Sequence, residues 1–246
     1  MHENNRKLFL TVLMESFSKT SASFKAQLAG VSYLLGSLLS LFGQFVVLDK
    51  IVVYDNAAAT AANILGHESM FRLGFVSSFM SVLFHFIWAA LFYALFKPVS
   101  RTLSLLAVFI MLAACSMWSL SAFFHLAPLS ILKGSSQLSA FSPEQLQSLG
   151  LIFLKLNVKA YDLGLIFFGL WCIVIGYLIS KSTFIPRIIG ILQMFAGLGY
   201  LIPLWQPLVH YFYPYNLALA GPGEISLMLW LLIKGVKNNI STIDKQ

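Results

Sequence analysis

Charged residues are scarce in this sequence. Of its 246 residues, 10% are charged and 59% are apolar, whereas about 25% of the residues in an average soluble domain are charged. Nine acidic and sixteen basic side chains are too few to cover the surface that a soluble domain of this length exposes to water. The scarcity argues against an ordinary soluble fold and indicates that lipid surrounds most of the chain.

Cysteines, clustered bases and nucleotide-binding motifs are also few or absent. The two cysteines, Cys115 and Cys172, lie in the middle of apolar runs, which favours small packing residues over a disulfide framework or a thiolate zinc site. The net charge of +7 comes from bases that stand one or two at a time at the ends of apolar stretches, so no nucleic-acid partner is expected. The sequence contains no phosphate-binding loop, dinucleotide fingerprint or nucleophile elbow, and no cofactor is expected.

Long apolar stretches dominate what is present. A helix needs about 20 mostly apolar residues to cross the hydrocarbon core of a membrane. Pro128 is expected to end the third such stretch, and Ser142, Pro143 and Gln145 offer a capping box that would start the fourth helix well before its lipid-embedded part. We therefore predict an all-α polytopic transmembrane bundle of six spans, at 26–47, 71–96, 102–126, 160–180, 184–202 and 218–236.

The basic residues predict the orientation of these spans. With the N-terminus in the cytoplasm, eleven bases fall in cytoplasmic segments and five in outer segments or at the outer boundary, as the positive-inside rule requires. An odd number of spans would place the basic tail outside. We expect both termini in the cytoplasm, with a cytoplasmic leader at 1–25 that suits an amphipathic helix on the membrane surface, a six-span domain at 26–236 and a cytoplasmic tail at 237–246.

The outer segments carry their own signals. Asp55 and Asn56 can cap a short helix that reaches about His67. Glu68 and Arg72 follow four residues apart in the order that favours a helix-surface ion pair. The last outer loop is rich in interfacial aromatic residues, namely Trp205, Tyr211, Tyr213 and Tyr215.

Several short motifs occur in a series that resembles a known family. They include Asp55-Asn56-Ala57, Lys97-Pro98, Ile185-Pro186-Arg187 and Gly223-Glu224-Ile225-Ser226. In this order they resemble the bacterial multi-pass membrane family called domain of unknown function 4386, over about residues 28 to 236. The resemblance implies a multi-pass bacterial membrane protein, and it implies no catalytic residue. We expect this protein to lie in the bacterial cytoplasmic membrane.

Glu224 is the first candidate for a functional side chain. An ionisable group within a span is costly unless it is paired or hydrated, and Glu224 lies early in the sixth predicted span, just after Gly221-Pro222-Gly223. The alternative is an N-terminal cap, in which the carboxylate meets free amides and the positive end of the helix dipole.

A second candidate is the polar cluster of Lys155, Lys159 and Asp162. The spacing places all three on one helical face, where Lys159 can pair with Asp162. Continuing by sevens from Asp162 leads to Gly169 and Gly176, and small residues at this spacing let a neighbouring helix come close. The fourth span is therefore expected to be a packing helix with a polar outer end.

The third candidates are His85 and His125, because both lie inside predicted spans. Each closes a Ser-x-x-x-His pattern, which resembles the serine–histidine step of intramembrane metal hydrolases. Those hydrolases also need an intramembrane aspartate and a late His-x-x-x-His pair, and the chain has neither. A zinc site usually takes three protein ligands, so no metal is expected.

Three functions remain open. The 22 phenylalanines and the few ionisable groups favour a non-enzymatic module that binds membrane lipid or an apolar small molecule, or an accessory or sensory subunit. An intramembrane hydrolase would use His85 or His125 with Glu224 or Asp162. A small-solute transporter would need a polar path past Asp162 and Glu224 to the inner face. The sequence names no protein partner.

Overall fold

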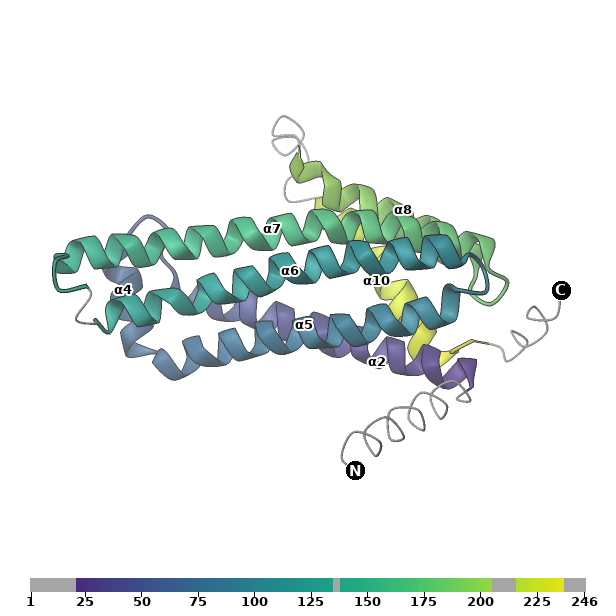
Figure 1. The fold of residues 1–246 in the computed structure, drawn as a ribbon, viewed down its shortest axis with the longest axis horizontal. Helices are drawn as coiled ribbons and strands as arrows, with labels where there is room; N and C mark the ends of the chain where they lie inside the picture. Colours follow the sequence, from purple (N-terminus) through teal and green to yellow (C-terminus); the bar gives the residue numbers. More distant parts are fainter. Residues whose placement is uncertain (1–20, 135–137, 205–215, 237–246) are drawn as a thin grey trace, which may run out of the picture.

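The computed structural model describes residues 21–134, 138–204 and 216–236. All regular structure in these ranges is helical (Figure 1), which confirms the all-α prediction. The predicted leader (apart from residues 21–25), the aromatic outer loop and the tail lie outside the described residues. The helices are α2 (Ala22–Leu41), which continues through the π-helical η1 (Phe42–Val47) into α3 (Leu48–Ile51), then α4 (Ala57–Gly66), α5 (Glu68–Phe96), α6 (Arg101–Leu132), α7 (Pro143–Lys181), α8 (Arg187–Leu201), the 3-10 turn η3 (Ile202–Leu204) and α10 (Asn216–Ile233).

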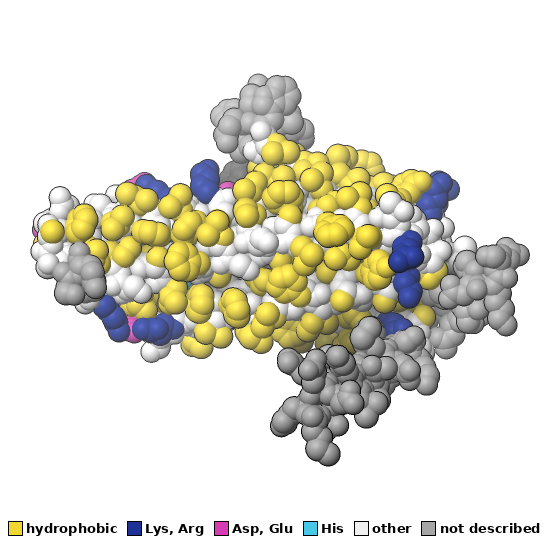
Figure 2. Space-filling model, viewed as in Figure 1, with side chains coloured by type: hydrophobic (Ala, Val, Ile, Leu, Met, Phe, Trp, Pro, Cys, Tyr) yellow, Lys and Arg dark blue, Asp and Glu magenta, His cyan; other side chains and the backbone are white. Residues whose placement is uncertain are grey.

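Five helical segments are long and apolar enough to cross a membrane: Ala22–Ile51, Glu68–Phe96, Arg101–Leu132, Pro143–Lys181 and Arg187–Leu204. The sixth predicted span corresponds to a shorter apolar helix, Leu219–Ile233. Hydrophobic side chains cover the middle of the face shown in Figure 2, and lysine and arginine gather toward its two ends. The distribution supports a multi-pass membrane protein.

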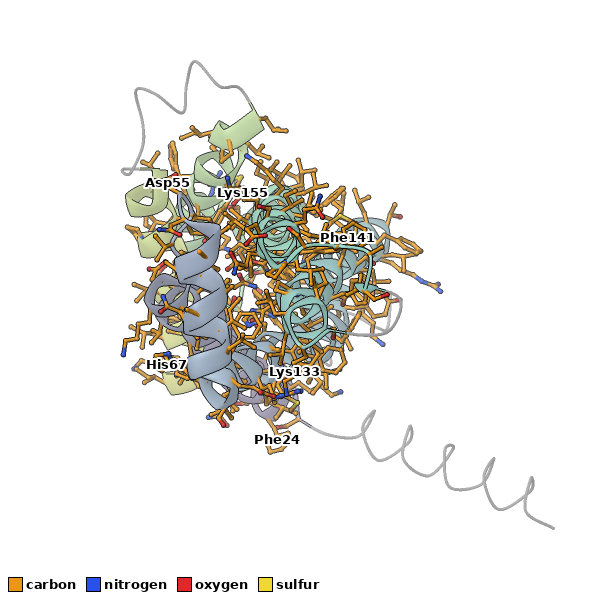
Figure 3. The ribbon with its side chains drawn as sticks, turned by 90° about the vertical axis from the view of Figure 1, so that its left-hand side faces the viewer. Phe24, Asp55, His67, Lys133, Phe141 and Lys155 are labelled. Atoms are coloured by element: carbon orange, nitrogen blue, oxygen red, sulfur yellow. The ribbon has the colours of Figure 1, made fainter. Side chains whose placement is uncertain are left out.

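Six helices form a ring. Going around it, α2 packs against α5, α5 against α6, α6 against α7, α7 against α8, α8 against α10, and α10 back against α2. The short α4 lies at one end against α7 and α6. In Figure 3, which looks along the bundle from that end, α4 crosses in front of helices that are seen nearly end-on.

Local signals set several helix ends where the sequence predicts them. The Ser142 side chain accepts from the Gln145 amide, and the Gln145 side chain accepts from the Ser142 amide at 2.8 Å, so the capping box is confirmed. Asn56 caps α4 by accepting from the Ala59 amide at 2.9 Å. The second predicted span ends at Phe96, just before Lys97-Pro98, as expected.

Pro128 does not end its helix, which corrects the predicted boundary of the third span. α6 continues through Pro128 to Leu132. A proline inside a membrane-embedded helix is tolerated where neighbouring helices accommodate it. Here the buried Pro128 ring faces Gly150 of α7, where an added Cβ would lie 3.6 Å from the proline Cβ. This is an ordinary packing distance, so the ring packs against α7 without strain and the helix is not interrupted.

Glycines also bring α7 and α8 together. A Cβ added at Gly169 would lie 2.8 Å from the carbonyl oxygen of Gly197, and one added at Gly176 would lie 2.6 Å from that of Gly190. Real Cβ atoms essentially never approach other atoms this closely. The predicted role of this glycine stripe in close helix packing is confirmed, and α8 is the partner.

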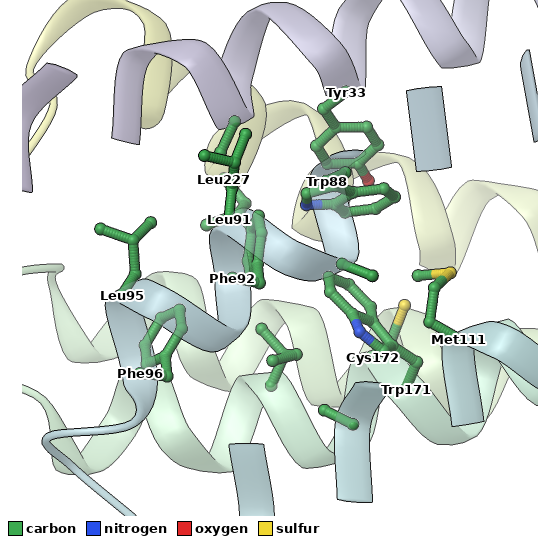
Figure 4. Packing of buried hydrophobic residues seen from close by; sticks show 14 of the residues in the cluster. Tyr33, Trp88, Leu91, Phe92, Leu95, Phe96, Met111, Trp171, Cys172 and Leu227 are labelled. Atoms are coloured by element: carbon green, nitrogen blue, oxygen red, sulfur yellow. The ribbon is translucent and has the colours of Figure 1, made fainter. Parts of the chain in front are cut away.

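The core between α2, α5 and α7 is aromatic (Figure 4). Trp88 is fully buried, and its ring lies 4.0 Å from the ring of Tyr33 and 4.5 Å from that of Trp171, between centroids. Phe92 and Phe168 pack on the same indole pair. This cluster lies next to the cavity described below.

Candidate functional site

A cavity of about 490 Å³ lies inside the ring of helices. Each of the six ring helices contributes to its wall, so it exists only when the ring is assembled. Its lining combines aromatic rings with a few polar groups: Tyr33, Ser37, Ser40, Leu41, Phe45, His85, Trp118, Tyr161, Leu165, Phe168, Tyr200 and Glu224.

Glu224 supplies the only carboxylate that the described residues bring to this lining. It lies midway along α10, which begins at Asn216 and passes through Pro222. The interpretation of Glu224 as an N-terminal cap is therefore wrong, because the free amides of a helix lie within its first turn. The Tyr200 hydroxyl of α8 donates a hydrogen bond to Glu224 Oε1.

Tyr33 of α2 approaches the same carboxylate from another side. Its ring is stacked on Trp88, and the residue is 2% exposed. Its hydroxyl lies near enough to Glu224 to interact with the carboxylate electrostatically, but it has no partner in hydrogen-bonding geometry among the described residues. Two tyrosines from different helices thus face one acid inside the bundle.

His85 of α5 presents its ring to the same cavity. A carbonyl oxygen only accepts, so the 2.7 Å contact of His85 Nδ1 with the Ser81 carbonyl makes Nδ1 the donor. In the neutral ring Nε2 is then the nitrogen that can accept a proton or a hydrogen bond. Gly36 of α2 packs closely on this ring, since a Cβ there would lie 3.2 Å from His85 Cε1.

The α2 side of the cavity reaches the outer surface of the bundle. Leu41 and Phe45 line the cavity and are 52% and 43% exposed. Both stand where the α-helix widens into the π-helical η1, and such π segments are frequent at functional sites. Ser40 joins this wall to α7 through a 3.1 Å hydrogen bond between its hydroxyl and that of Tyr161.

Comparison with known proteins identifies the family. A family model described as a domain of unknown function (DUF4386) matches residues 28–235. The chain belongs to the DUF4386 family. It is 37% identical over 78 residues to an uncharacterized protein of Archaeoglobus fulgidus, and the match covers 31% of this chain and 46% of that relative, about half its length. No solved structure matches the chain.

Of the six predicted site residues in this DUF4386 chain, the cavity brings together Glu224 and His85. His125 lies elsewhere: it is fully buried and its Nε2 donates to the Phe71 carbonyl oxygen at 3.0 Å. The two histidines thus stand in different surroundings. Within the described ranges, no group of three His, Cys, Asp or Glu residues could hold a metal ion.

The predicted polar cluster on α7 does not line the cavity. Lys155 and Lys159 are exposed and Asp162 is half-buried. Lys159 interacts electrostatically with Asp162, but the described residues contain no ion pair between them. Asp162 faces the loop after α3, where burial and the charges of Asp49 and Asp162 raise the pKa of Tyr54.

The predicted ion pair between Glu68 and Arg72 is confirmed at 2.8 Å, from Arg72 Nε to Glu68 Oε1. Lys133, at the end of α6, binds the same oxygen at 2.7 Å. Sequence spacing finds the first pair because it is local on one helix. It misses Lys133, which stands 65 residues from Glu68.

Sequence reasoning also missed two buried amides. Asn157 of α7 donates at 2.8 Å to both the carbonyl and the hydroxyl oxygen of Ser121, and the Ser121 hydroxyl donates to the Asn157 carbonyl at 3.0 Å. Gln193 of α8 donates to the sulfur of Cys172 at 3.2 Å. The available signal was that each amide is a polar residue within an apolar helix, which usually bonds to a neighbouring helix.

Proposed function

We propose that the chain crosses a bacterial cytoplasmic membrane six times, with both termini in the cytoplasm. α10 has 18 residues, a length of about 27 Å, which is close to the hydrocarbon thickness of about 30 Å. Its place in the ring beside α2 and α8 also supports a sixth span.

The charge distribution supports this orientation. At the end of the bundle where α2 and α8 begin and α5, α7 and α10 end, every described charged residue is basic: Lys25, Lys97, Arg101, Lys181, Arg187 and Lys234. Toward the other end the described acids and bases are equally numerous. The purely basic end is the one that the positive-inside rule assigns to the cytoplasm.

Reporter fusions test the topology. Fusions after Lys97, Lys181 and Lys245 are expected to report a cytoplasmic location. Fusions at Asn63, Ser136 and Tyr213 are expected to report an external one, because one span separates each fusion site from the next along the chain. An external reading at Lys245 would contradict six spans.

We propose that the protein binds an apolar or amphipathic small molecule, or a lipid, in the cavity. The observation that carries this proposal is a cavity of about 490 Å³ with walls from all six ring helices. Its size lies within the range of about 300–1,000 Å³ found for ligand pockets, and its lining has the usual composition of apolar walls and a few placed polar groups.

The depth of the cavity indicates where the ligand comes from. At about 1.5 Å per residue, Glu224 lies about 14 Å, His85 about 17 Å and Tyr200 about 20 Å along their helices from the basic end. These depths fall within a hydrocarbon core of about 30 Å. The exposed Leu41 and Phe45 at the border of the cavity suit entry from the lipid.

Filling the cavity tests the proposal. Ser37→Phe places a ring in the lined space, so native mass spectrometry is expected to find a retained small molecule on the unaltered protein and to find it lost from this variant. Ser116→Phe is the matched control, because Ser116 lies exposed on α6. Equal retention by both variants would refute the cavity as the binding site.

An intramembrane hydrolase is the second candidate, because His85 and Glu224 line one cavity. A hydrolase would release a cleaved product from a membrane lipid extract, and His85→Gln would stop the release, whereas a binding protein returns its ligand unchanged. Transport is less well supported. The described core between the cavity and the basic end is filled by Trp88, Trp171 and Phe92 rather than by a polar path.

A further inference from the structure

We propose that the cavity selects an organic cation, an amphipathic amine or quaternary ammonium compound whose positive group lies against Glu224 and whose apolar part lies between aromatic rings. This inference rests on the proposed binding function and names the class of ligand. It follows from the charge of the lining, the arrangement of its rings and the depth of the carboxylate.

The charge of the cavity is unbalanced. Among the described residues, Glu224 is the only acid in the lining, and no lysine or arginine lines it. The ion pairs among the described residues are those of Glu68 at the far end of the bundle, so Glu224 has none there. A carboxylate at this depth is costly without a cationic partner, and a cationic ligand would supply one.

The hydrogen bonds to Glu224 leave room for such a partner. Tyr200 donates to one carboxylate oxygen, Oε1. An ionised carboxylate has two oxygens and about four acceptor positions. The Tyr33 hydroxyl also acts on the carboxylate but makes no hydrogen bond in good geometry among the described residues. Acceptor positions therefore remain for an amine N–H or an ammonium group that approaches from the cavity.

Aromatic side chains line the cavity together with Glu224. The ring of Phe168 lies 5.4 Å from that of Tyr200 and 5.8 Å from that of Trp118, between centroids. Trp118 in turn lies 6.3 Å from Tyr161. The negative faces of such rings attract ammonium groups, and aromatic cages are a known means of binding them. Hydroxyl groups of Ser37 and Ser40 add acceptors.

Other ligand classes fit this lining less well. An anion would meet the Glu224 carboxylate and tyrosine rings without a basic residue. A metal ion would need further ligands, and the described residues hold no suitable group of three. A neutral hydrocarbon would leave the carboxylate unmatched. An organic cation satisfies the carboxylate and the rings together.

Two probes of the same shape test the charge. The first is trimethyl(3-phenylpropyl)ammonium, and the second is its uncharged isostere with carbon in place of nitrogen. Binding of each to the purified full chain in detergent is measured by calorimetry. The ammonium compound is expected to bind more tightly than the isostere. Glu224→Gln is expected to lower the affinity for the ammonium compound on the order of a hundredfold and to leave the affinity for the isostere unchanged. Glu144→Gln, an exposed carboxylate on α7, is the control and should alter neither.

The outcomes separate this inference from the proposed function. If the isostere binds as tightly as the ammonium, or if Glu224→Gln leaves ammonium binding intact, the cation class is refuted while cavity binding stands. If Ser37→Phe leaves the binding of both probes unchanged, or neither probe binds, both proposals fail. The comparison of the two probes on the unaltered chain decides the cation class even if Glu224→Gln does not fold.

Discussion

Gly176→Leu is expected to lower the midpoint of thermal unfolding in detergent by roughly 5–10 °C, or to prevent folding. A Cβ at this position would lie 2.6 Å from the Gly190 carbonyl oxygen and 2.9 Å from the Met194 amide nitrogen, both of them backbone atoms of α8. Backbone atoms within a helix cannot rotate away as a side chain can. The two helices would have to separate along their whole contact.

Leu substitutions at two other glycines provide the comparison for this result. At Gly66 nothing lies within 4 Å of an added Cβ, so Gly66→Leu should change the midpoint little. Gly74 is an intermediate case: an added Cβ would meet Val47 Cγ1 at 2.7 Å and His125 Cε1 at 3.0 Å, which are side-chain atoms that can shift. Equal tolerance at Gly176, Gly74 and Gly66 would contradict the close contact of α7 with α8.

Trp88→Ala is expected to reduce the free energy of unfolding by about 3–5 kcal/mol. The indole is fully buried, stacks on Tyr33 and packs edge-on against Trp171. Its removal would leave a void at the junction of α2, α5 and α7 and would release Tyr33, which faces Glu224. Equilibrium unfolding in mixed micelles, followed by circular dichroism, measures the loss.

Phe123→Ala is the control for this change. Phe123 is also aromatic and lies on a spanning helix, but it is 62% exposed on the outside of the bundle. Removal of its ring should reduce the free energy of unfolding far less, because lipid or detergent replaces the lost contacts. A similar loss for both variants would mean that Trp88 is not a centre of packing.

Local patterns in the sequence predict much of the fold. The box of Ser142 and Gln145, the Asn56 cap and the stop at Lys97-Pro98 act within a few residues, and the structure has all three. The seven-residue spacing of Gly169 and Gly176 also gives the packing face of α7, since helical periodicity fixes which residues share a face. What these patterns do not give is the partner helix.

The cavity depends on contacts between helices that are far apart in the sequence, and local patterns do not predict these contacts. His85 and Glu224 stand 139 positions apart in the chain, and only closure of the ring by α10 places them around one space. The sequence predicts that Pro128 ends α6, because the packing of a neighbouring helix around the proline cannot be seen from one helix alone. The alternative that Glu224 caps a helix start fails for a similar reason: Gly221-Pro222-Gly223 is typical of a helix start, yet α10 runs through it.

Photoaffinity labelling tests the binding function most directly. A diazirine-tagged alkyl amphiphile is bound to the purified protein in lipid nanodiscs, cross-linked by light and located by peptide mass spectrometry. The account predicts label on the α7 stretch from Tyr161 to Phe168 and at Trp118, competed away by excess untagged amphiphile and lost in Ser37→Phe. Label at lipid-facing positions such as Phe109 and Phe123 should remain under both conditions. Label confined to those outer positions, with none that is competed from the cavity wall, would contradict the account.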